Sequence, residues 1–215
     1  MQDDPPKNPR QQKAFRRLNV ASPSASFHEV LVVARSRNLE AICKNFIERL
    51  AKTNPYDALL CNLMFVSGLQ LSEALAFKPH DSIRHDGLHI SKGTMDGRTR
   101  FIPNAKSPHL AQRQRLVYEC WLRQTTNSTQ RNLFLEGLSI ERRACRFQRV
   151  LAFHRQLSGL SITDHHLRIA YARMMFEDCM GYSHPTKGSY SLASTEEHCL
   201  LVKASIQLVM RAMGH

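Results

Sequence analysis

The sequence predicts a mainly α-helical domain with one small antiparallel β-sheet. Two observations predict this fold class: apolar residues recur at three- and four-residue steps over most of the chain, and two short β-type runs stand around residues 87–103. With 215 residues, of which 42% are hydrophobic, the chain is long enough to bury one good core. We expect one folded domain over residues 37–215, preceded by a basic, largely flexible tail over residues 1–36.

The tail is predicted from its composition. Residues 1–26 combine several prolines and basic residues with little apolar surface to bury. The apolar run at residues 30–33 fits either a short strand or a helical turn, and the sequence does not choose between them. A basic tail of this kind can follow DNA phosphates without sequence preference, but many such tails are only disordered chain ends.

The first half of the folded part is expected to hold three helices. The first carries apolar residues on one face, at Leu39, Ile42, Phe46 and Leu50. Asn54 and Pro55 end this helix and start the next, because asparagine caps helices and proline suits the first helical position. The second helix runs over about residues 55–66 and ends at Gly68. A short helix follows over residues 72–77.

A hairpin and four longer helices are expected next. Residues 87–90 and 99–103 predict two strands joined by a turn through Gly93. Helical periodicity then returns over about residues 108–124, 139–157, 164–180 and 198–213. Thr163 or Asp164 would cap the third of these helices, and residues 181–197 are predicted to form a loop.

The faces of two of these helices can be predicted from their apolar spacing. In the helix over 108–124 the residues expected to face the core are Leu110, Leu116, Val117 and Trp121. In the helix over 139–157 the residues expected to face inward are Ile140, Ala144, Phe147 and Leu151. Its opposite face would present the arginines Arg142, Arg146 and Arg149. These three could contact DNA phosphates, and a merely solvated helix face fits them equally well.

Composition limits the functional classes. The net charge of +12 favours a polyanionic partner, and nucleic acid more than a membrane surface. The six cysteines are scattered without a C-x-x-C pair, which favours free thiols in a reducing cytoplasm and predicts no metal site. Since no apolar run approaches the ~20 residues of a membrane span, we expect a cytoplasmic protein.

Three stretches of the chain carry residues suited to phosphate chemistry. The first, over residues 66–75, is a helix junction with Gly68, Gln70 and Glu73. The second is the hairpin, which contains one lysine, two arginines and the pattern GT..GR.R..P. The third combines the pattern HHLR.AYA, which begins at His165, with the Gly-His pair that ends at His215.

In this order the stretches resemble the boxes of the tyrosine recombinase (phage-type integrase) catalytic domain. The hairpin and the LR.AYA run look closest to integrases of proteobacterial mobile elements, and the resemblance covers roughly residues 37–215. It implies the DNA breaking-rejoining catalytic-domain fold and a double-stranded DNA partner. It also implies site-specific DNA recombination and integration by phosphotyrosyl strand exchange, with no cofactor, a possible homo-oligomer on DNA, and a nucleoid-associated protein.

The resemblance also implies roles for individual residues. Arg168 would be the second of two arginines that hold the charge on the nonbridging phosphate oxygens. His165 would handle the proton of the nucleophile, and His215 would donate a hydrogen bond to the phosphate. Lys92 is the only lysine in the hairpin and would protonate the leaving oxygen. Counting back from the proline that ends the hairpin instead places Met95 at the lysine position, and both alignments stay open.

The sequence departs from the family at two places. Gln70 stands where the resemblance implies the first arginine; it can donate a hydrogen bond but carries no charge. The nucleophilic tyrosine is expected shortly after His215, the last residue of the sequence, while Tyr171, Tyr182 and Tyr190 precede it in the wrong order. We therefore expect this chain to be inactive or truncated as a recombinase.

Two further expectations concern the residues around this site. Glu73 would keep a structural role, because one acid cannot bind anionic DNA directly. Arg98 and Arg100 of the hairpin are predicted to contact DNA, together with the three arginines of the helix over 139–157. An alternative function is a noncatalytic, recombinase-derived DNA-binding module with a regulatory role.

Overall fold

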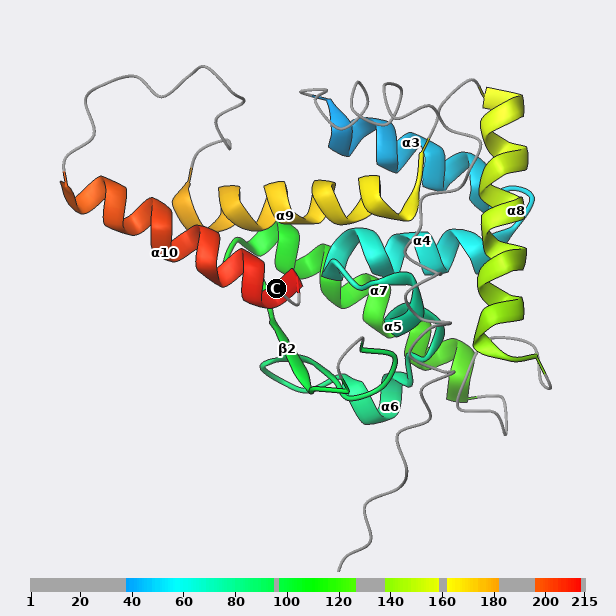
Figure 1. Ribbon diagram of the computed structural model, residues 1–215, viewed down its shortest axis with the longest axis horizontal. Coiled ribbons are helices and arrows are strands. Elements are labelled where there is room, and N and C mark those ends of the chain that lie inside the picture. Colours follow the sequence, from blue (N-terminus) through cyan, green and yellow to red (C-terminus); the bar gives the residue numbers. More distant parts are fainter. Residues whose placement is uncertain (1–37, 95–96, 127–137, 159–161, 182–195, 214–215) are drawn as a thin grey trace, which may run out of the picture.

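The computed structural model describes residues 38–94, 97–126, 138–158, 162–181 and 196–213 (Figure 1). Within these ranges the chain forms helices and one two-stranded antiparallel sheet, as the sequence predicted. The elements are α3 (Leu39–Ala51), α4 (Pro55–Ser67), α5 (Leu71–Leu75), α6 (Pro79–Ser82), β1 (Gly87–Ile90), β2 (Arg100–Pro103), α7 (Pro108–Thr126), α8 (Ile140–Ser158), α9 (Asp164–Met180) and α10 (Glu196–Met213). None of the described helices is long and apolar enough to cross a membrane.

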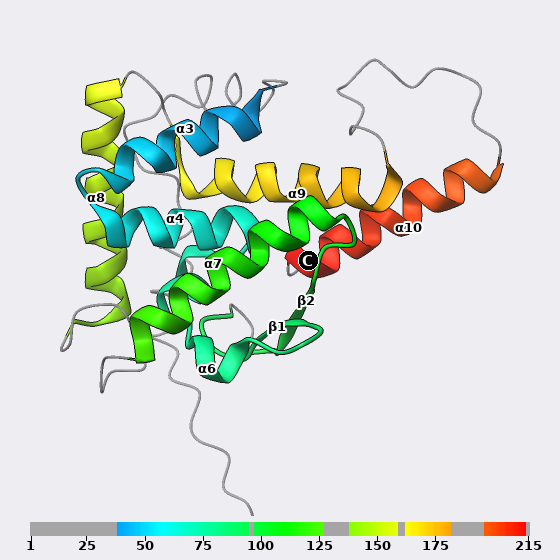
Figure 2. The same cartoon turned by 180° about the vertical axis from the view of Figure 1, so that it is seen from behind.

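Helix α4 is the centre of the core. It is apolar on most of its circumference, and a helix of that kind has to be covered on all sides. Helices α3, α7 and α9 pack around it, and the two opposite views show α4 enclosed among them (Figures 1 and 2). Its residues Leu60, Leu63 and Val66 are fully buried. The end of α4 is therefore held firmly, and the chain leaves it at a fixed point.

The connection from α4 to α5 is a tight turn. Gly68 caps α4 in the left-handed conformation, with φ of 64°. A Cβ atom at this position would lie 2.3 Å from Cδ1 of Tyr171 and 2.9 Å from Sδ of Met213. Only a glycine lets α9 and α10 approach this closely, because any side chain would overlap with both. The junction thus brings together elements from three distant parts of the sequence.

The sheet consists of β1 and β2, with Gly87 opposite Pro103 and Ile90 opposite Arg100. Alternate residues point to opposite faces, so Leu88 and Ile102 are buried while Phe101 is exposed. One face of the hairpin therefore packs on the helical core. The tail over residues 1–36 and the loop predicted over 181–197 lie outside the described residues, apart from Gly181 and the first two residues of α10.

Two predictions about the helices were wrong. The short helix expected over residues 72–77 is α5, which ends at Leu75, and α6 was not predicted because its four residues are too few to show a period. Leu116 was expected in the core, but 57% of it is exposed. The buried stripe of α7 passes instead through Gln114, whose amide is satisfied internally: it donates to the carbonyl of Val66 and accepts from the backbone NH of Ala105. Because Gln114 is polar, the sequence pattern did not predict that it lies in the core.

The close contact at Gly68 predicts a large loss of stability on substitution. Gly68→Ala should lower the free energy of unfolding by about 1–2 kcal/mol, because alanine disfavours the left-handed conformation. The overlap of its Cβ atom with Tyr171 should lower it by a further amount of about 1–3 kcal/mol. Gly181→Ala is the matched control, because Gly181 caps α9 with φ of 73° and a Cβ atom there would have no neighbour within 4 Å among the described residues. Urea unfolding of both variants measures the difference, and equal losses would contradict the tight contact.

Candidate active site

Arg168 lies where α4, α9 and α10 meet. It belongs to α9, and its side chain is half-buried. Its Nε donates to the carbonyl of Gly68 at 3.2 Å, and its Nη2 donates to the carbonyl of Met213 at 2.9 Å. These two bonds connect the end of α4 with the end of α10 across 100 and 45 residues of sequence. Both acceptors are neutral, so they fix the guanidinium in place without neutralising its charge.

Glu73 is the buried carboxylate of the site. Only 2% of it is exposed, and its Oε2 accepts from the backbone NH of Gln70 at 2.7 Å and from Nη2 of Arg100 at 2.5 Å. Burial raises the pKa of Glu73, an effect that the charge of Arg100 opposes. The structural role expected for Glu73 is consistent with this placement, since it ties the start of α5 to β2.

Arg100 is buried, which was not predicted from the sequence. It was expected to contact DNA, but its side chain is only 7% exposed and pairs with Glu73. Burial lowers the pKa of the Arg100 guanidinium, Glu73 counteracts this, and the nearby charge of Arg168 lowers it further. Strand alternation could have predicted this burial, because it places Arg100 on the same face as the buried Ile102. Arg98, just before the strand, is exposed as expected.

The turn of the hairpin lies directly against α5. Ser72 donates its hydroxyl to the carbonyl of Gly93 at 2.7 Å. Gly93 has φ of 78°, and a Cβ atom there would lie 2.5 Å from the carbonyl oxygen of Ser72. This contact brings Lys92, which is exposed, close to the α5 start. Met95, the alternative for the lysine position, lies outside the described residues.

The start of α9 positions His165. Thr163 caps the helix, and its backbone NH donates to Nδ1 of the buried His166 at 3.0 Å. His165 is exposed and lies three residues before Arg168, so the two share one face of α9. Partial burial lowers the pKa of His165, and the charge of Arg168 lowers it further. This shift favours the neutral imidazole, which is able to accept a proton.

Four of the five predicted catalytic residues lie within the described residues. Gln70 and Lys92 lie at either side of the contact between α5 and the hairpin, and His165 and Arg168 lie on the first two turns of α9. His215 lies outside the described residues, although Met213 brings the end of α10 to Arg168.

The predicted DNA-contacting arginines of α8 are exposed. Helix α8 packs against α5 with its apolar face, which includes Ala144, Phe147 and Leu151. Arg142, Arg146 and Arg149 lie on the outside, as predicted. Nη2 of Arg146 lies 3.7 Å from Oδ2 of the buried Asp57, so this arginine already has an acidic neighbour.

The described tyrosines do not offer a nucleophile at this site. Tyr171 is fully buried, and burial raises its pKa. Tyr118 is also buried with a raised pKa, and Tyr56 is exposed in the first turn of α4, at the far end of that helix from Gly68. Tyr182 and Tyr190 lie outside the described residues.

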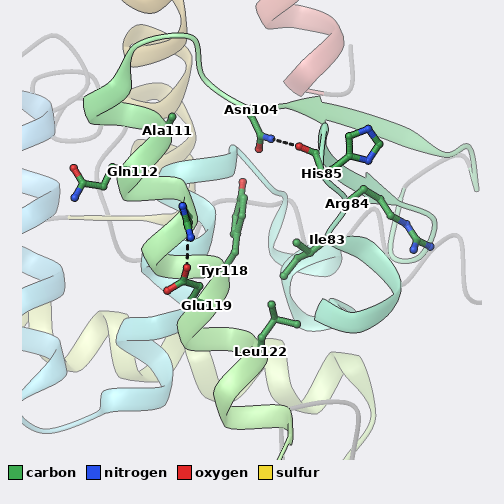
Figure 3. Close-up of a pocket in the computed structure, with 10 residues that line it drawn as sticks. Ile83, Arg84, His85, Asn104, Ala111, Gln112, Tyr118, Glu119 and Leu122 are labelled. Atoms are coloured by element: carbon green, nitrogen blue, oxygen red, sulfur yellow. Dashed lines mark hydrogen bonds and ion pairs between the residues drawn. The ribbon is translucent and has the colours of Figure 1, made fainter.

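A hollow of about 560 Å³ is lined by other residues (Figure 3). It is bounded by α7 and by residues 83–85, and the side chain of Asn104 borders it and donates to the carbonyl of His85 at 2.9 Å. None of the candidate catalytic residues lines it. Among the described residues, no group of three histidine, cysteine or acidic side chains is arranged to hold a metal ion.

Comparisons with models of protein families, with curated proteins and with solved structures found no match to this chain. A function can therefore be proposed only from the residues of the site and their geometry.

The pKa of His165 should be measurably low. In a titration followed by NMR of the imidazole carbon-bound protons, we expect its midpoint below the ordinary value of about 6.5. Arg168→Ala should raise that midpoint, because a nearby positive charge disfavours the imidazolium. His165→Gln identifies the resonance by its disappearance. A midpoint that Arg168→Ala leaves unchanged would show that the two side chains do not interact.

Proposed function

We propose that this chain binds double-stranded DNA and holds a backbone phosphate at the site around Arg168, as a protein of the tyrosine recombinase (integrase) type. In this proposal it belongs to a system for DNA recombination and integration. The observation that supports the proposal most is that distant segments of the chain meet in space. The junction after α4, the hairpin turn, the start of α9 and the end of α10 meet at one place, although they are far apart in the sequence.

The chemistry of these residues suits a phosphodiester. The guanidinium of Arg168 offers planar donors that match two phosphate oxygens, and it is already oriented by the carbonyls of Gly68 and Met213. A neutral His165 beside it can accept a proton. Lys92, exposed at the end of β1, has an ammonium group that could donate one.

Exposed basic side chains elsewhere on the fold are suited to contact the rest of the duplex. Arg142 and Arg149 are exposed on α8, which packs against α5, and Arg98 is exposed beside the hairpin. Together with a net charge of +12, these side chains favour a backbone-tracking, salt-dependent mode of binding. Phosphotyrosyl strand exchange would need, in addition, a tyrosine that the described residues do not supply.

A second candidate is a noncatalytic DNA-binding module with a regulatory role. It is favoured by Gln70, because a neutral amide holds the position where the resemblance implies an arginine. The two candidates differ in covalent chemistry. A nicked suicide substrate would trap a covalent protein–DNA complex with a recombinase and none with the module. Sequence-selective binding that survives Arg168→Ala would also favour the module.

DNA binding itself should be weak and steeply dependent on salt. We expect the affinity for a 30-base-pair duplex, measured by fluorescence anisotropy, to fall roughly a hundredfold between 50 and 200 mM salt. Arg168→Ala should weaken binding about tenfold and make the slope of log K against log salt shallower by about one.

Arg49→Ala is the control for this experiment, because Arg49 is exposed in the last turn of α3, outside the site. It should change neither the affinity nor the slope by a comparable amount, and thermal unfolding checks that both variants are folded. Binding that is absent at 50 mM salt, or insensitive to salt, would refute the proposed function.

A further inference from the structure

Two guanidiniums and two carboxylates lie near the starts of α5 and α9, and they are not equally paired. Glu73 is the carboxylate between two guanidiniums: it pairs directly with Arg100, and its charge also acts on Arg168. Asp164, one turn before Arg168, acts on it too, but no ion pair joins the two among the described residues. The two hydrogen-bond acceptors of Arg168 are neutral carbonyls, so its half-buried guanidinium has no carboxylate in direct contact among the described residues. A guanidinium in this state favours the binding of an anion.

The guanidinium of Arg100 lies close to the backbone of Gln70. The same oxygen of Glu73 accepts from the backbone NH of Gln70 and from the guanidinium of Arg100. The guanidinium therefore lies beside the start of α5, although it comes from β2, 30 positions later in the chain. It brings to this place the charge that the side chain of Gln70 does not have.

The hydroxyl of Tyr171 is a second sign that a ligand belongs here. Tyr171 is fully buried, and among the described residues its hydroxyl has no hydrogen-bond partner. Its ring contacts Gly68, whose carbonyl accepts from Arg168. Burial raises the pKa of its hydroxyl, and the charge of Arg100 opposes this effect. Buried hydroxyls are rarely left without a partner, and a phosphate oxygen would satisfy this one.

We propose that Arg100 takes the place of the arginine missing at Gln70, so that Arg100 and Arg168 together bind one phosphate group. This inference rests on the proposed function, and it identifies a second phosphate-binding guanidinium for that site. Two guanidiniums from different elements, β2 and α9, hold two oxygens of the anion, while Glu73 keeps Arg100 oriented. Gln70 then serves only to start α5.

Inorganic phosphate tests the site directly in the full chain. We expect 100 mM phosphate to raise the melting temperature by about 3 °C over sodium chloride of the same ionic strength. The double variant Glu73→Gln, Arg100→Gln removes the ion pair as a unit, so neither of its members is left as an unpaired buried charge. It leaves the net charge unchanged, and it should lose most of the phosphate-dependent shift.

Three further variants sharpen the result. Adding Gln70→Arg to the double variant should restore the shift, because it returns a guanidinium to the α5 start. Arg100→Lys keeps the ion pair with Glu73 but replaces the planar fork by a single ammonium, and it should retain less than half of the shift. Arg49→Gln, on α3, should keep the whole phosphate-dependent shift. It thereby controls for the loss of an arginine outside the site and for the general stabilising effect of phosphate.

A double variant or an Arg100→Lys variant that keeps the full phosphate shift would overturn the inference. The proposed function is judged separately by DNA binding. If DNA binds as expected while the phosphate shift is insensitive to Arg100, the inference fails and the proposed function stands. If phosphate binds through Arg100 but DNA does not bind, the anion site stands and the proposed function fails.

Discussion

The carboxylate of Glu73 is the point on which the arrangement of the site depends. Its Oε2 holds the backbone NH at the start of α5 and the guanidinium of Arg100 from β2, and both bonds are buried. Since a hydrogen bond to a charged group is stronger in a medium of low dielectric constant, this oxygen fixes helix and strand together more firmly than an exposed pair would. The hydroxyl of Ser72 adds a second connection, to the hairpin turn. The hairpin is thus positioned by α5 as much as by its own strand pairing.

A second group of contacts positions the helices that carry the basic side chains. Gly68 lets Tyr171 and Met213 approach the end of α4, and Arg168 then bonds the carbonyls of Gly68 and Met213. Packing and hydrogen bonding act on the same few atoms here. A shift of any one element would move the guanidinium, so the geometry around it is set by the core and not by a surface loop.

The sequence predicted most of the fold and part of the site. Helices such as α4 and α9 have long apolar periods and clear end signals, so their bounds were predicted to within about two residues. Short elements and pairings across the fold were not predicted. The buried ion pair between Arg100 and Glu73 joins residues 27 positions apart, and no local pattern shows which of several charged side chains turns inward. Leu116 and Gln114 show the same limit, because the buried amide depends on partners that only the tertiary structure supplies.

The cap of α9 uses an imidazole nitrogen as its acceptor. The backbone NH of Thr163 donates to Nδ1 of His166, so this nitrogen must carry no proton. Most helix caps use a hydroxyl or a carboxylate as the acceptor, and an imidazole loses its acceptor when it becomes charged. The first turn of α9, which also carries His165, is tied to Thr163 through this nitrogen and through the backbone NH groups of His166 and Leu167, which donate to the carbonyl of Thr163. The same imidazole that fills a buried position of the core thus also fixes where α9 begins.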